Sequence, residues 1–125
     1  MNDEYKQPSE FEITLADLRF HAHHGVMPQE TMVGNEFCVS VSVRIPYSAD
    51  ILDDSLDATI SYADIYEIVK EEMRKPKKLL ETVAAIIRER LSSRWPQIKR
   101  GEITICKSTP PIGGITGNAK VRLFF

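Results

Sequence analysis

Five side chains in four short segments are of types that carry out chemistry on small molecules. His24 and Glu30 lie in a segment that also contains glycine and proline. Tyr62 and Glu81 stand at the starts of two helical patterns, and Lys107 ends a strand pattern. Carboxylates, phenols and ammonium groups accept and donate protons, so proton transfer is the chemistry that this set could perform. Each residue also has an ordinary explanation, because such residues in loops, at helix starts and at strand ends are mostly exposed and inert.

The three histidines of the chain, His21, His23 and His24, suggest a second kind of chemistry. His21 and His23 would share one face of a strand, a spacing that can bind zinc. A zinc site needs a further ligand that converges on the same point, and the chain has no fourth histidine. We therefore expect no metal and no other cofactor. Zinc is the competing hypothesis, and metal analysis of the purified protein would test it.

The spacing of apolar residues predicts the elements that hold these side chains. Apolar residues alternate from Phe37 to Ile45, which is typical of a strand with one buried face. A shift in the alternation near Asp17 predicts a bulge in the preceding strand. Helical spacing follows Ser61, a good N-cap with Asp64 three residues later. The whole pattern gives two strands, two helices and two strands, at about 11–21, 37–45, 61–73, 79–94, 102–107 and 121–125.

This order predicts an α+β domain over residues 11–125, after a flexible N-terminal tail at 1–10. The expected structure is a four-stranded antiparallel sheet with two helices on one face. The loop over 23–35 is longer than a hairpin needs, so we expect function there. Such a sheet leaves two edges unpaired, and unblocked edges are association sites. Joining of several subunits into a barrel would remove the edges, so we expect self-assembly.

The bulk composition excludes several classes of protein. A net charge of -2 over 125 residues gives no electrostatic case for binding nucleic acid or an anionic membrane. The first ten residues lack the apolar core of a signal peptide, and no stretch is long enough to span a bilayer. Cys38 and Cys106 lie in apolar alternating runs and are expected to be buried free thiols. We therefore expect a cytoplasmic protein.

Four motifs in order resemble those of the dihydroneopterin aldolase family. They are an H-G-x-x-x-x-E element ending at Glu30, a tyrosine opening the first helix, L-L-E at 79–81, and a lysine before a P-I loop. The resemblance extends over 11–125. The sequence departs from the family pattern at two places: Asn35 stands where glutamine is common, and Ser108-Thr109 separates Lys107 from the prolines.

The resemblance implies the tunnelling fold and a reaction of folate biosynthesis. In this reaction 7,8-dihydroneopterin is cleaved to 6-hydroxymethyl-7,8-dihydropterin and glycolaldehyde. The dihydropterin already contains a C6=N5 imine that takes up the electrons of the broken bond, so neither a Schiff base nor a metal is needed. The family roles imply that Lys107 is the general base, that Tyr62 shuttles a proton, and that Glu30 anchors the side-chain hydroxyls and a water.

The resemblance also implies a binding site for the pterin ring. Glu81 would accept hydrogen bonds from the exocyclic amine and the neighbouring ring N–H together, as a carboxylate does with a bidentate guanidinium. Backbone groups near Ile60, Ser61 and Leu80 would complete this site. Family members form homo-oligomers, commonly octamers, with active sites between subunits and the tyrosine contributed by a neighbouring chain. The partner of the protein is therefore a small-molecule pterin and further copies of itself.

Two other functions fit the same residues. An epimerase of dihydroneopterin or its triphosphate would cleave the bond and re-form it on the other face. A non-catalytic barrel module would keep the pterin pocket without turnover. Product analysis separates these hypotheses, because only the aldolase releases glycolaldehyde.

Overall fold

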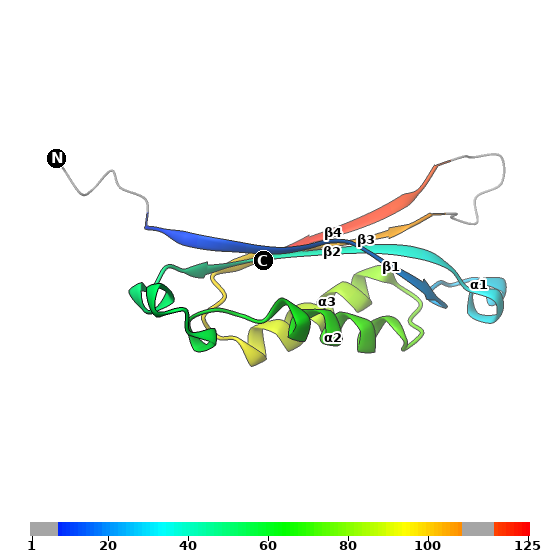
Figure 1. Ribbon diagram of the computed structural model, residues 1–125. Helices are drawn as coiled ribbons and strands as arrows, with labels where there is room; N and C mark the ends of the chain where they lie inside the picture. Colours follow the sequence, from blue (N-terminus) through cyan, green and yellow to red (C-terminus); the bar gives the residue numbers. More distant parts are fainter. Residues whose placement is uncertain (1–7, 109–116) are drawn as a thin grey trace.

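The computed structural model describes residues 8–108 and 117–125, which form two layers (Figure 1). One layer is an antiparallel sheet whose strand order, β1-β2-β3-β4, follows the chain. The strands are β1 (Glu10–Ala22), β2 (Asn35–Pro46), β3 (Arg100–Lys107) and β4 (Ala119–Phe124). The other layer is α2 (Tyr62–Met73) and α3 (Leu80–Arg94), which both cover the same face of the sheet. The predicted α+β fold is confirmed.

Three short helices complete the described chain: α1 (Pro28–Val33), η2 (Ala49–Asp53) and η3 (Leu56–Ala58). The first of them corrects the prediction of a plain loop over 23–35. Pro28 at the first helical position is pre-set for helix, and the Met27 N–H donates to Glu30 Oε1 at 3.3 Å. Of the predicted N-terminal tail, residues 1–7 lie outside the described residues, so the tail stays a prediction.

The bulge expected in the first strand is present. Pairing of β1 with β2 shifts between Leu15 and Leu18, and Asp17 has a left-handed backbone with φ of 58°. The Asp17 N–H donates to Ser40 Oγ on β2 at 3.0 Å, which holds the bulge against the neighbouring strand.

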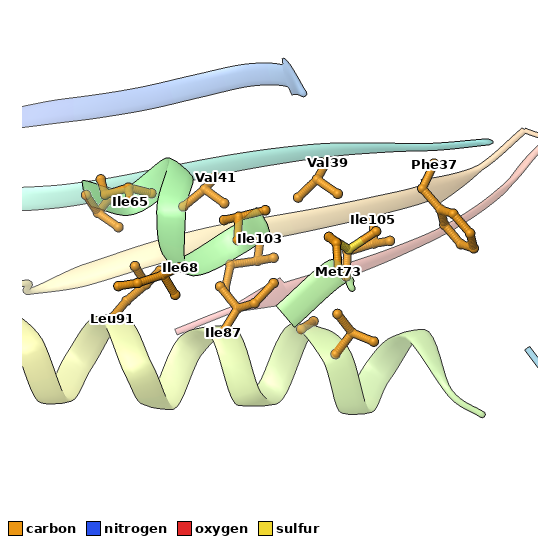
Figure 2. Close-up of a cluster of buried hydrophobic side chains, with 14 of the residues drawn as sticks. Phe37, Val39, Val41, Ile65, Ile68, Met73, Ile87, Leu91, Ile103 and Ile105 are labelled. Atoms are coloured by element: carbon orange, nitrogen blue, oxygen red, sulfur yellow. The ribbon is translucent and has the colours of Figure 1, made fainter. Parts of the chain in front are cut away.

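The core lies between the sheet and the two helices (Figure 2). Alternate residues of β2 point toward the helices and are buried, which confirms the period-2 pattern. The apolar faces of α2 and α3 pack against these β2 side chains. The core residues labelled in Figure 2 are Phe37, Val39, Val41, Ile65, Ile68, Met73, Ile87, Leu91, Ile103 and Ile105. Within the described residues, no helix is both long enough and apolar enough to cross a bilayer.

The two cysteines differ from the prediction in one respect. Cys38 and Cys106 are free thiols, as expected, but they are half-buried rather than buried. They are cross-strand partners on β2 and β3, and they point to the sheet face that the helices leave uncovered. The apolar alternation identified the strands correctly, but the covered face is the one that carries Val39 and Ile105.

Candidate functional site

A buried ion pair joins Glu30 to Lys107, which are 77 residues apart in the chain. Glu30 lies in the first turn of α1, and Lys107 is the last residue of β3. Their exposed fractions are 7% and 8%. Charged side chains are rarely buried to this degree, and they require a partner when they are. Two of the three residues predicted to be catalytic are therefore brought into direct contact.

The sheet register explains why Lys107 is buried. Side chains alternate along β3, so Lys107 lies on the same face as Ile103 and Ile105, at the end of the core row. It pairs with Phe37 across the ladder, and its Nζ lies 5.8 Å from the centre of the Phe37 ring. The aromatic face and the Glu30 carboxylate together hold the ammonium at the boundary of the core.

Gly25 makes room for the carboxylate. It has φ of 151°, a conformation that side chains rarely adopt, and a Cβ there would overlap all three carboxylate atoms of Glu30. The glycine of the H-G element is thus required for two reasons, the backbone conformation and the close approach of Glu30.

His24 connects this pair to the linker between the two helices. Its side chain is fully buried, its ring packs edge-on against Phe37, and its Nδ1 accepts a hydrogen bond from the Lys77 N–H at 3.1 Å. The Gly25 N–H donates to the Lys77 carbonyl at 2.9 Å. Burial, followed by the positive charge of Lys107, lowers the pKa of His24. His24 was singled out only as a candidate side chain of the H-G element and Phe37 not at all, because the contacts that give them a role depend on tertiary structure.

The residues predicted to bind the pterin are placed at the start of α3. Leu80 is buried in the core, which fixes the first helical turn, whereas Glu81 is exposed. Glu81 borders an open groove between α2 and α3, where Ile68 and Thr82 are also found. Within the described chain, no hydrogen bond or ion pair joins Glu81 to Glu30 or Lys107, and neither of these two residues borders the groove, so the structure does not bring Glu81 together with the buried pair.

Tyr62 is not part of this group within one chain. It opens α2, next to the buried Ile60 and to Ser61, whose Oγ accepts from the Asp64 N–H at 3.4 Å as the predicted N-cap. The other end of α2 leads into the linker that contacts His24. A helix of 12 residues places these ends about 16 Å apart. Tyr62 is 66% exposed, and one subunit does not bring it to Lys107.

A family model described as FolB, dihydroneopterin aldolase, matches residues 13–124, which is most of the chain. The chain belongs to the dihydroneopterin aldolase family. This confirms the family predicted from the four motifs.

Relatives of this family are similar along most of their length. A dihydroneopterin aldolase of Streptococcus pyogenes serotype M18 is 31% identical over 103 residues, covering 82% of this chain and 87% of the relative. The crystal structure of E. coli dihydroneopterin aldolase in complex with neopterin superposes with a TM-score of 0.77 at 20% identity, covering 92% and 98% of the two chains. A dihydroneopterin aldolase from Burkholderia thailendensis bound to guanine gives 0.70 at 14% identity, covering 93% and 90%. The two structures establish the fold.

The rings of His21 and His23 pack edge-to-face with their centres 5.4 Å apart, and their nitrogens contact groups in and beside α1. His21 Nδ1 contacts Glu36 Oε1 at 2.8 Å, and its Nε2 contacts the Val33 carbonyl at 3.1 Å. The Glu36 carboxylate raises the pKa of His21. His23 Nδ1 contacts the Thr31 carbonyl at 3.0 Å. Within 8–108 and 117–125, no three His, Cys, Asp or Glu side chains gather as metal ligands would.

The proline-rich loop that follows Lys107 in the family pattern falls mainly within residues 109–116. Those residues lie outside the part of the chain that the structure describes.

Proposed function

We propose that this chain carries out the aldolase reaction of its family, with Lys107, Glu30 and Tyr62 as the catalytic residues. The substrate is 7,8-dihydroneopterin, and the products are 6-hydroxymethyl-7,8-dihydropterin and glycolaldehyde, in folate biosynthesis. The single observation that carries the assignment of residues is the buried Glu30–Lys107 pair. A buried ion pair adds little net stability compared with apolar residues, so its presence beside the His24-Gly25 segment that contacts the linker favours a functional role.

The reaction requires movement of one proton and one electron pair. The base removes the proton of the 2′-hydroxyl, the C1′–C2′ bond breaks, and its electrons move into the C6=N5 imine. Glycolaldehyde leaves, and protonation of C1′ gives the hydroxymethyl product. Lys107 removes the proton as the neutral amine, directly or through a water, after its own ammonium proton has passed to the adjacent Glu30 carboxylate. The other oxygen of Glu30 accepts a hydrogen bond from the side chain of the substrate. Because the pair already holds both groups in place, little reorganisation is needed when the substrate binds.

The pterin ring is recognised at the other side of the site. The Glu81 carboxylate accepts hydrogen bonds from the exocyclic amine and the adjacent ring N–H. It lies in the first turn of α3, where a negative charge interacts favourably with the helix dipole. Backbone groups near Leu80, and near Ile60 and Ser61 of a neighbouring subunit, complete the ring site.

The catalytic tyrosine comes from a neighbouring copy of the chain. Two observations support this: Tyr62 is exposed, and it lies at the end of α2 opposite to the linker. The sheet order leaves β1 and β4 as edges, which several subunits can pair into a barrel. The proposed assembly is a homo-octamer with active sites between subunits, located in the cytoplasm.

Incubation of the purified protein with 7,8-dihydroneopterin, with and without a chelator, tests this function. We expect equal formation of glycolaldehyde and 6-hydroxymethyl-7,8-dihydropterin under both conditions. Epimer without glycolaldehyde would identify an epimerase, and pterin binding without any product would identify a binding module. Loss of activity together with stoichiometric zinc in the chelator fraction would refute the metal-free mechanism.

A further inference from the structure

We propose that His24 is a positioning residue, whose neutral imidazole fixes the linker 74–79 and so sets the separation between Glu81 and the Glu30–Lys107 pair. The inference rests on the proposed function, to which it adds a residue that does not touch the substrate. It is carried by the contacts that His24 and Gly25 make with the linker on one side and with the ion pair on the other.

Both backbone groups of a single linker residue are held by the His24-Gly25 segment. The Lys77 N–H donates to His24 Nδ1, and the Lys77 carbonyl accepts from the Gly25 N–H. Lys77 is only four residues before Glu81, and α3 begins between them at Leu80. The position of the first turn of α3 is therefore tied to this segment as well as to the core contacts of Leu80.

The same segment contacts the catalytic pair. Gly25 packs so closely on the Glu30 carboxylate that a Cβ would overlap it. The His24 ring packs on Phe37, whose other neighbour is the Lys107 ammonium at 5.8 Å from the ring centre. The His24-Gly25 dipeptide thus contacts the surroundings of Glu30 and Lys107 and also holds the linker that leads to Glu81.

The hydrogen bond requires one particular form of the imidazole. Because Nδ1 is the acceptor, the ring proton resides on Nε2, which is buried. Protonation of Nδ1 would remove the only acceptor for the Lys77 N–H in this contact.

The charges around the ring favour its neutral form. Those that face it are Lys107 from β3, Lys77 from the linker and His23 from the preceding strand segment, and each lowers the pKa of His24 in addition to burial. The carbonyl of Met73 in α2 acts in the opposite direction, and Glu30 faces Lys107.

Two amide substitutions separate positioning from simple packing. In His24→Asn, Oδ1 is two bonds from Cβ, as Nδ1 is, so the acceptor for the Lys77 N–H is kept. In His24→Gln, the acceptor is one bond further, at the place of Nε2, and the Lys77 N–H loses its partner. The two variants carry the same functional group and differ only in where it lies.

The measurements are neopterin affinity, KM and kcat with 7,8-dihydroneopterin, each followed from about pH 8 to about pH 5. We expect His24→Asn to stay within about 3-fold of wild type and His24→Gln to lose at least about 10-fold in affinity and in kcat/KM, as one lost hydrogen bond to a functional element would cause. Wild type should lose affinity as the pH falls through the pKa of His24, which burial and Lys107 lower from the ordinary histidine value of about 6.5. The asparagine variant has no imidazole at this position, so its affinity should not show this pH-dependent loss.

Equal constants and equal pH profiles for the two variants, with only the melting temperature changed, would overturn the inference. If the glutamine variant fails to fold, hydrogen exchange of the Lys77 backbone amide in the wild type is the alternative test. Protection of this amide, corrected for intrinsic exchange, should fall between pH 8 and pH 5. Constant protection over this range would also overturn the inference. If wild type forms no glycolaldehyde while neopterin affinity follows the expected pattern, the proposed function fails and the positioning role stands. If wild type forms both products while the two His24 variants behave alike, the proposed function stands and the positioning role of His24 fails.

Discussion

Lys107 lies directly opposite Phe37 across the β2–β3 ladder, with its ammonium nitrogen 5.8 Å from the centre of the aromatic ring. The core row of the sheet therefore ends in a cation that an aromatic face and a carboxylate hold from two sides. An ordinary lysine at a strand end would instead extend into water. This arrangement makes the role of Lys107 directly testable.

Lys107→Ala should abolish turnover and spare pterin binding. Loss of a positioned acid–base group costs roughly 100- to 10,000-fold in rate, whereas the pterin ring is held by other residues. Rates of glycolaldehyde formation and neopterin fluorescence titrations measure the two effects. Lys120→Ala is the control, because Lys120 is exposed on β4. Parallel loss of binding in Lys107→Ala would contradict the proposed division of roles.

Glu81→Ala should weaken pterin binding. Two hydrogen bonds to a charged acceptor are lost, which corresponds to a decrease in affinity of roughly 100- to 10,000-fold. Glu89→Ala is the matched control, since Glu89 is also an exposed carboxylate of α3 that borders the same groove. If both variants bind neopterin like wild type, Glu81 does not contact the ring.

Gly25→Ala should displace the Glu30 carboxylate and inactivate the protein. Gly117→Ala is a matched control, because Gly117 has φ of 141° but nothing lies within 4 Å of its added Cβ. Both variants have the backbone strain of about 1–3 kcal/mol, and only the first has the overlap. Comparison of unfolding free energies and specific activities separates the two contributions. Equal activity of the two variants would show that the close approach of Glu30 is dispensable.

Tyr62→Phe and Lys107→Ala should complement each other when their subunits are mixed. With the tyrosine supplied by a neighbouring chain, random reassembly of two inactive variants restores both groups in about a quarter of the sites, because each position is filled independently with probability one half. Activity is measured after joint denaturation and refolding, with each variant refolded alone as the reference. Absence of any recovered activity in a mixed oligomer would place both groups in one subunit.

Glu72 should contribute stability that depends on pH. It is buried on α2, and although burial alone would raise its pKa, hydrogen bonds from Lys75 and Arg90 lower it overall. A lowered acid pKa means that the stabilisation is present above the unfolded value, near 4.5, and is lost as the pH falls through the folded value. We expect Glu72→Gln to unfold more readily in urea at pH 7 by about 1–3 kcal/mol. The difference should shrink at pH 3, and a constant difference would disprove the linkage.

The main elements could be predicted because their side chains have a clear period. Apolar residues alternate along β2 and recur at helical spacing along α3, because each element has one face covered by the other layer. The irregular alternation near Asp17 identified the bulge. The helix α1 could not be predicted, because six residues are too few to establish a helical period. The lysine, glutamates and tyrosine of the site followed from the resemblance in motif order. The role of His24 did not, since its contact with Lys77 spans 53 positions in the chain.

The separation of Glu30 and Lys107 along the chain affects how the protein gains activity during refolding. Their contact forms only after β3, which follows both long helices, has docked beside β2. An intermediate containing only the β1–β2 hairpin and α2 would have the carboxylate without its ammonium partner. Recovery of catalysis after dilution from denaturant should therefore come no earlier than the docking of β3 and the assembly of subunits, and later than signals from the local hairpin and helices.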